Sequence, residues 1–230
     1  MRYTLPAAGR AQLDVGTTNR VLRNTYTLLA ITLLPTIAGA YFGALFPLME
    51  KLGWISIIVF IGAMFGIQAM VIKNRNSAKG IAWLLFFTLV MGYFTGPLVG
   101  YALGSYSNGA ELVGLAIGGT ATMFFGLAGY ATVTKRDFSS ISFGKALGMG
   151  MWMLFAIMIV NSFFQSSAIA LAVSSFVIVI SSGLILFTIN RIVRGGEDNY
   201  IMATMVLYIM VLNLFQSLLH LLMMFGGARD

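Results

Sequence analysis

The chain has 230 residues, of which 59% are apolar and only 9% are charged, and its mean hydropathy is +0.90. This balance excludes a soluble globular domain, which devotes about a quarter of its residues to charged side chains. The net charge of +7 does not indicate nucleic-acid binding, because the basic residues lie in short clusters between apolar runs. With no cysteine and one histidine, the chain is not expected to form disulfides or Cys- or His-based metal sites, and no cofactor is expected.

Seven apolar runs predict seven transmembrane helices, because about 20 residues at 1.5 Å rise cross a bilayer core about 30 Å thick. Residues 1–24 precede the first run and contain no signal-peptide core, so we expect a flexible cytoplasmic tail. Residues 25–230 are then one all-α membrane domain, a seven-helix bundle. The runs lie near Tyr26–Phe46, Trp54–Ile72, Ile81–Leu103, Leu112–Thr134, Ala146–Phe164, Ile169–Asn190 and Tyr200–Phe225.

The basic residues between the runs predict the orientation of the bundle. Most lysines and arginines lie in the N-terminal tail and in every second loop, which share one side of the membrane. The opposite side holds only Lys51 and Arg229. Because positive loops stay in the cytoplasm, we expect a cytoplasmic N-terminus and a periplasmic C-terminus. The cytoplasmic set is Arg2, Arg10, Arg20, Arg23, Lys73, Arg75, Lys79, Lys135, Arg136, Lys145, Arg191 and Arg194.

Pairs of glycines four residues apart favour close helix packing inside the bundle. Such pairs are Gly92 and Gly96, Gly114 and Gly118, and Gly144 and Gly148. A hinge at Gly96 and Pro97 is the alternative for the first pair, and Pro35 is expected to kink the first helix.

No acidic residue lies well inside a predicted span, so the candidate interior groups are uncharged polar side chains and one histidine. Four of them share one face of the last helix and should turn away from lipid, either as interhelical hydrogen bonds or as a hydrated path. A Ser182–His220 protease dyad is not expected, because the two residues lie at different depths. The face comprises Asn213, Gln216, Ser217 and His220, and Asn161 and Gln165 are further candidates for the polar interior or a pore.

Six fragments in order along the chain resemble the Bax inhibitor-1 family, also called the transmembrane Bax inhibitor motif family. They are VLRNTY at 21–26, GYFTGP at 92–97, AIGGTATMFF at 116–125, TKRDFS at 134–139, SSGLILF at 181–187 and GGEDNY at 195–200 followed by LYxxxLNLFxSLL at 207–219. The resemblance implies a seven-helix bundle with a central last helix. Its motif and hinge positions here are Gly92, Gly96, Pro97, Gly118, Gly119, Gly195 and Gly196.

The resemblance implies two functions, neither enzymatic. Some relatives resemble calcium or proton leak channels gated by paired acids, but Thr188 and Met210 occupy those positions here and do not titrate. Bacterial members resemble modulators of the membrane-anchored, ATP-dependent protease FtsH, acting as inhibitors or slow substrates. We therefore expect an inner-membrane protein that contacts lipid and an FtsH-type protease, with a cation leak channel, passing calcium or protons, as the alternative.

Overall fold

The computed structural model describes residues 7–47, 52, 53 and 55–227, and the regular structure of this part of the chain is entirely helical. All seven helices are long and apolar enough to cross a membrane, which confirms the predicted spans. The helices are α1 (Ala7–Leu45), α3 (Ile55–Lys73), α4 (Ala78–Ser105), α5 (Gly109–Val133), α6 (Ile141–Phe164), α7 (Ser167–Val193) and α8 (Tyr200–Gly226).

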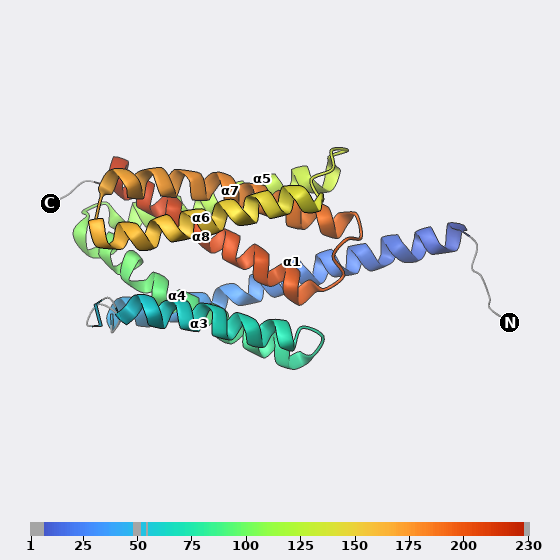
Figure 1. Cartoon of the computed structure of the whole chain (residues 1–230), viewed down its shortest axis with the longest axis horizontal. Coiled ribbons are helices and arrows are strands. Elements are labelled where there is room, and N and C mark those ends of the chain that lie inside the picture. Colours follow the sequence, from blue (N-terminus) through green and yellow to red (C-terminus); the bar gives the residue numbers. More distant parts are fainter. Residues whose placement is uncertain (1–6, 48–51, 54, 228–230) are drawn as a thin grey trace.

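The segment expected to be a flexible tail is helical from Ala7 onward. It continues into the first span, which starts at Thr18, and Figure 1 shows these first turns of α1 projecting beyond the neighbouring helices. The expectation was wrong because a helix that is already nucleated extends through polar residues without needing an apolar run. Arg2 and the rest of residues 1–6 lie outside the described residues.

The helices form two groups with α8 between them. In Figure 1, α1, α3 and α4 lie on one side, α5, α6 and α7 lie on the other, and α8 crosses obliquely. The last helix packs against α1, α4, α5 and α7, and its side chains Leu207, Leu214 and Leu219 are fully buried. The central position of the last helix therefore agrees with the family resemblance.

Glycines bring α1 and α4 into backbone contact. A Cβ atom on Gly92 would overlap the carbonyl oxygen of Thr36, and one on Gly96 would lie 2.6 Å from the amide nitrogen of Ala44. The close packing predicted for Gly92 and Gly96 is confirmed, and α4 runs without a break through Pro97. Helix α1 likewise continues through Pro35.

The other two glycine pairs differ from that expectation. Gly114, Gly118 and Gly148 have open space where a Cβ would stand, whereas Gly144 lies against the ring of Phe187. Spacing places glycines on one face of a helix, but another helix must cross that face before the missing side chain matters.

Helices α3 and α6 are the least buried members of the bundle. Each has one buried residue, Val71 in α3 and Leu154 in α6. Their aromatic side chains nevertheless meet, because Phe65 and Trp152 stack with ring centroids 5.4 Å apart. These two helices therefore flank the core built by α1, α4, α5, α7 and α8.

Candidate functional site

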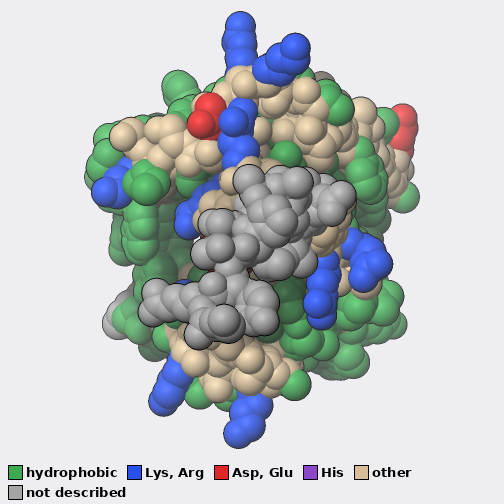
Figure 2. All heavy atoms as spheres, turned by 90° about the vertical axis from the view of Figure 1, so that its right-hand side faces the viewer, with side chains coloured by type: hydrophobic (Ala, Val, Ile, Leu, Met, Phe, Trp, Pro, Cys, Tyr) green, Lys and Arg blue, Asp and Glu red, His purple; other side chains and the backbone are tan. Residues whose placement is uncertain are grey.

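Lysine and arginine side chains gather at the end of the bundle that holds the N-terminus, here called the cationic end. The turn between α3 and α4 and the loops between α5 and α6 and between α7 and α8 all lie there (Figure 1), and Figure 2 views this end directly. The described cations of this end are Arg20, Arg23, Lys73, Arg75, Lys79, Lys135, Arg136, Lys145, Arg191 and Arg194. Arg2, Lys51 and Arg229 lie outside the described residues, and so does the side chain of Arg10.

Asn190 and Arg194 tie the end of α7 to the loop between α5 and α6. The Asn190 side chain is 1% exposed; its Oδ1 accepts the Phe138 amide at 2.9 Å, and its Nδ2 donates to the Ala131 carbonyl at 3.2 Å. Arg194 donates to the same Oδ1 and to the carbonyl oxygens of Lys135 and Arg136. Two residues one turn apart thus satisfy backbone groups that α5 and its loop leave open.

Asp137 adds a carboxylate to this junction. Hydrogen bonds from the Ser139 hydroxyl and amide, at 2.6 and 2.8 Å, hold the pKa of Asp137 below its usual range, with a smaller contribution from the Arg194 guanidinium at 3.5 Å. Because the folded pKa is depressed, this contribution is present at neutral pH and is lost only as pH falls through the lowered pKa. The ion pair is exposed, so the Arg194 bonds to backbone carbonyls matter more than the charge.

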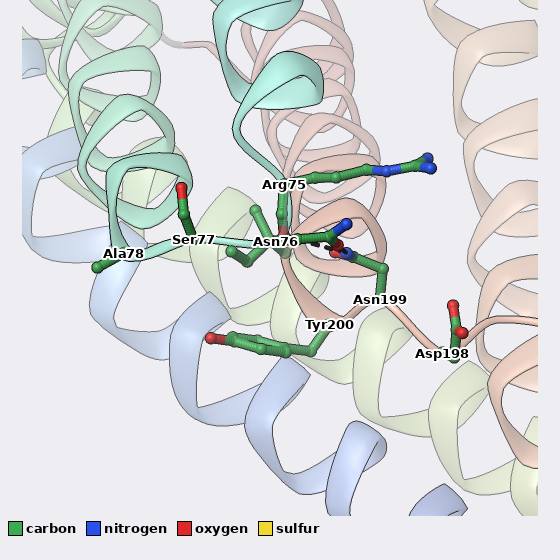
Figure 3. Close-up of a pocket in the computed structure, with 8 residues that line it drawn as sticks. Arg75, Asn76, Ser77, Ala78, Asp198, Asn199 and Tyr200 are labelled. Carbon is green, nitrogen blue, oxygen red and sulfur yellow. Dashed lines mark hydrogen bonds between the residues drawn. The ribbon is translucent and has the colours of Figure 1, made fainter.

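Asn199 joins the loop before α8 to the turn between α3 and α4. Its Oδ1 accepts the Met202 amide and so caps α8, and its Nδ2 donates to the Arg75 carbonyl and to Asn76 Oδ1 at 3.0 and 2.8 Å. A pocket of about 350 Å³ opens here (Figure 3), with the Asn76–Asn199 pair at its centre and the Arg75 and Asp198 side chains on one side. The pocket offers hydrogen-bonding groups to a polar partner.

The Gly195–Gly196 motif ends α7. Gly195 adopts a left-handed conformation with φ of +72°, and the Gly196 amide donates to the Arg191 carbonyl at 2.8 Å. Arg191 in turn donates to the Gly196 carbonyl and lies 3.7 Å from Glu197. The family motif therefore shapes the loop that carries Asn199.

The polar face of α8 contacts three different helices. Gln216 donates to the Thr95 hydroxyl of α4 at 2.7 Å, and His220 Nδ1 lies 2.9 Å from the Ser174 hydroxyl of α7. Asn213 Nδ2 lies 4.0 Å from the Met151 sulfur of α6. These contacts are separate interhelical bonds rather than a continuous ladder.

His220 does not pair with Ser182. The Ser181 and Ser182 hydroxyls, both in the middle of α7, have no hydrogen-bond partner among the described residues. The Ser174–His220 pair lacks the third group of a catalytic triad, because no described carboxylate bonds to His220. In the described part of the chain, no cluster of three or more His, Asp or Glu residues that could hold a metal ion is found.

The two positions that the family resemblance matches to paired acids are buried. Thr188 of α7 and Met210 of α8 are each 6% exposed, and Met210 belongs to the main apolar core. Neither side chain carries a charge, so this part of the α7–α8 interface has no titrating pair.

Asn161 and Gln165, predicted as candidates for the polar interior or a pore, lie at the C-terminal end of α6. Gln165 ends α6 in a left-handed conformation with φ of +52° and is exposed, and Asn161 Oδ1 accepts the Ser166 amide at 3.1 Å. Both therefore build the turn between α6 and α7 at the opposite end from the cationic loops. Amides at a helix end satisfy orphan backbone groups, a role that spacing alone did not reveal.

For several residues that hold the bundle together, the sequence did not predict the contacts that they make. Asn190, Arg194 and Asn199 bind loops more than 50 residues away in sequence, and Tyr208 bonds to Thr36 and to the Thr88 carbonyl. An asparagine followed four residues later by arginine at the end of a span was the available signal for the first two. The contacts of Asn199 and Tyr208 depend on which helices and loops are neighbours, and a single sequence does not predict this.

We predict that single cysteines in this cysteine-free chain will report the orientation. Ser77 and Ser140 lie in loops of the cationic end, and Ser107 lies in the loop between α4 and α5 at the other end; all three are exposed. In intact spheroplasts, a membrane-impermeant thiol reagent should label only the Ser107→Cys variant, because positive loops stay inside. Labelling of Ser77→Cys instead would reverse the topology.

The sequence of this chain is similar to a known protein family and to several bacterial proteins. Residues 18–227 match the family described as "Inhibitor of apoptosis-promoting Bax1". A Pseudomonas aeruginosa protein is 37% identical over 226 residues, covering 98% of this chain and 97% of its own length. The "Modulator of FtsH protease YccA" of Escherichia coli K12 is 36% identical over 205 residues, covering 89% of this chain and 90% of its own length. An Escherichia coli O6:H1 protein with the same identity and coverage is named "Inner membrane protein YccA".

Proposed function

Because this chain belongs to the Bax inhibitor-1 family and is a multi-pass protein of the inner membrane, we propose that it binds and modulates an FtsH-type protease. It acts as an inhibitor or a slow substrate, and not as an enzyme. Its cationic end faces the cytoplasm, and residues 1–24 serve as the segment that the protease engages. Residues 25–230 form the membrane domain that resists extraction by the protease.

The observation that carries this proposal is the combination of a projecting helix and an interlocked bundle at the same end. Helix α1 begins at Ala7, well before the span that starts at Thr18, so its first turns extend beyond the bundle (Figure 1). When a protease pulls on this segment, the force acts directly on the close-packed interface between α1 and α4. It must then break the Asn190, Arg194 and Asn199 contacts that join three loops.

Such an arrangement makes extraction slow, because each step must open packing that does not loosen locally. A protease occupied with a slow substrate degrades other substrates less often. Inhibition and slow degradation are then two outcomes of one property, the resistance of the bundle to being pulled apart.

We predict that deleting residues 2–17 will lengthen the half-life of the chain severalfold in proteoliposomes that contain FtsH and ATP. The deletion removes the projecting turns of α1 and leaves the first span intact. The half-life is measured by the loss of full-length chain on gels, and binding by copurification with a proteolytically inactive FtsH. Binding should persist in the truncated chain.

The matched control replaces residues 2–17 by a Gly/Ser segment of the same length, which should restore degradation because the protease needs an accessible segment rather than a particular sequence. Unchanged turnover of the truncated chain would place recognition elsewhere. If neither the full-length nor the truncated chain copurifies with the inactive FtsH, the proposal that FtsH is the partner is contradicted.

The alternative function, a cation leak channel, is favoured by the polar groups on the central helix. Asn213, Gln216 and His220 are only partly buried, whereas the Ser181 and Ser182 hydroxyls are buried and lack partners among the described residues. Partly accessible polar groups at membrane depth are typical of a water-lined path. Calcium passing through the bundle would meet these groups.

We predict that any calcium flux through the wild-type chain in liposomes will depend little on pH between 5 and 8. Thr188 and Met210 cannot change charge in that range, whereas Thr188→Asp combined with Met210→Asp should introduce a pH response. His220→Gln should change the flux little. A steep acid-activated flux in the wild type that His220→Gln abolishes would place the sensor at His220 and favour the channel.

A further inference from the structure

A shallow, wide-open hollow of about 380 Å³ lies on the outward face of α4, close to the cationic end. Its four lining residues follow one face of the helix, because they stand at positions i, i+3, i+4 and i+7. Lys79 and Ala82 are exposed and Phe86 is 47% exposed, so the hollow opens toward the membrane and not toward the core. The lining residues are Lys79, Ala82, Trp83 and Phe86.

The chemistry of the hollow changes along the helix axis. Lys79 is the second residue of α4 and stands at the cationic end, and Phe86 follows seven residues, or about 10 Å, deeper. The rings of Trp83 and Phe86 pack edge to face, with centroids 6.0 Å apart, and the small side chain of Ala82 leaves room beside the rings. The hollow is therefore cationic at headgroup depth and apolar at acyl-chain depth.

The ammonium group of Lys79 is not paired with a described carboxylate, although Asp198 lines the neighbouring pocket together with Ala78. Among the described residues, Lys79 forms no salt bridge. The sequence contains no Asp or Glu between Glu50 and Glu111, which spans α3, the following turn and α4. The charge of Lys79 is thus available to a ligand, and the ligand must also supply an apolar part to fill the rest of the hollow.

We propose that this hollow binds one anionic phospholipid of the leaflet at the cationic end. The lipid phosphodiester pairs with the Lys79 ammonium group, and one acyl chain runs over Ala82 beside Trp83 and Phe86. A lipid with a net negative charge fits better than a zwitterionic one, whose choline group brings a second cation to Lys79. The site does not depend on a protease partner, so its failure would leave the proposed function untouched.

The test uses the fluorescence of Trp83 in the full chain, with Trp54 and Trp152 replaced by phenylalanine. The protein is reconstituted into vesicles of phosphatidylglycerol and phosphatidylcholine in which one or the other lipid is brominated, because bromine quenches only a nearby indole. The two quenching curves give the ratio of affinities at Trp83. We expect phosphatidylglycerol to be favoured about fivefold, the order expected for one lysine at an anionic surface.

Three variants separate the site from the general charge of this end. Lys79→Gln should bring the ratio close to one, whereas Lys145→Gln, which removes an exposed lysine from the same end on α6, should leave it unchanged. Ala82→Leu places a bulky side chain where the acyl chain would lie while keeping Lys79, and it should also remove the preference. All three positions are exposed, so the variants should fold, and elution as a single peak in size-exclusion chromatography checks this.

Three results would overturn the proposal. A ratio near one in the protein with Lys79 intact would show that the hollow does not select anionic lipid. An equal loss in Lys79→Gln and Lys145→Gln would show a diffuse surface charge in place of a site. A full preference in Ala82→Leu would show that the lipid binds outside the hollow.

Discussion

Replacing Gly92 by alanine is expected to destabilise the bundle by about 1–3 kcal/mol, although it adds a single methyl group. The new Cβ would overlap the Thr36 carbonyl oxygen of α1, which is backbone and cannot rotate away. The two helices would have to move apart along their shared interface, and the neighbouring contact of Gly96 with Ala44 would be lost with it. The free energy of unfolding is measured by SDS titration in mixed micelles.

Gly118→Ala on α5 is the matched control, because the same methyl group meets nothing within 4 Å there. Alanine favours helix over glycine by about 1 kcal/mol, so this variant should be neutral or slightly more stable. Equal effects of the two substitutions would mean that the α1–α4 contact does not carry the stability assigned to it.

Replacing Asn190 by leucine should lower the free energy of unfolding by about 2–4 kcal/mol, because it removes the side-chain partner of one buried and one partly buried backbone group. The Phe138 amide and the Ala131 carbonyl both bond to this side chain, and Arg194 loses its anchor at Oδ1. The loop between α5 and α6 should then also exchange its amide protons faster, which hydrogen exchange with mass spectrometry detects.

Asn213→Leu provides the comparison within the membrane. Its side chain contacts the Met151 sulfur at 4.0 Å, a weak interaction, and it is only partly buried. We expect Asn213→Leu to lower the free energy of unfolding by less than about 1 kcal/mol. If the two variants lose similar stability, the junction at Asn190 is not a special contact, and the resistance of the cationic end would need another origin.

The seven spans and their shared cationic end were predictable because they depend on chain length and charge, which act along one dimension. An apolar run of about 20 residues has few alternatives to a spanning helix, and alternating positive loops then share one end. The helical segment from Ala7 was not predictable on this basis, because its sequence carries neither the apolar run nor the periodic face that indicates a helix.

The contacts between helices were only partly predictable. Gly92 and Gly118 both stand in four-residue glycine spacings, yet one touches α1 and the other meets open space. Likewise, Gln216 and His220 share a helix face but bond to Thr95 of α4 and Ser174 of α7. A sequence pattern fixes the direction in which a side chain points along its own helix, and the neighbour it meets depends on the packing of the whole bundle.

The most direct test of the central claim measures how the chain affects degradation of a second membrane substrate by FtsH in proteoliposomes. The wild-type chain, Gly92→Ala and Gly118→Ala are each added at equal amounts, and the loss of both proteins is followed on one gel. We predict that the wild type and Gly118→Ala slow degradation of the second substrate severalfold, and that Gly92→Ala is itself degraded faster and relieves this inhibition. A second substrate that is degraded at the same rate with and without the wild-type chain, or equal inhibition by a rapidly degraded Gly92→Ala, would contradict the account.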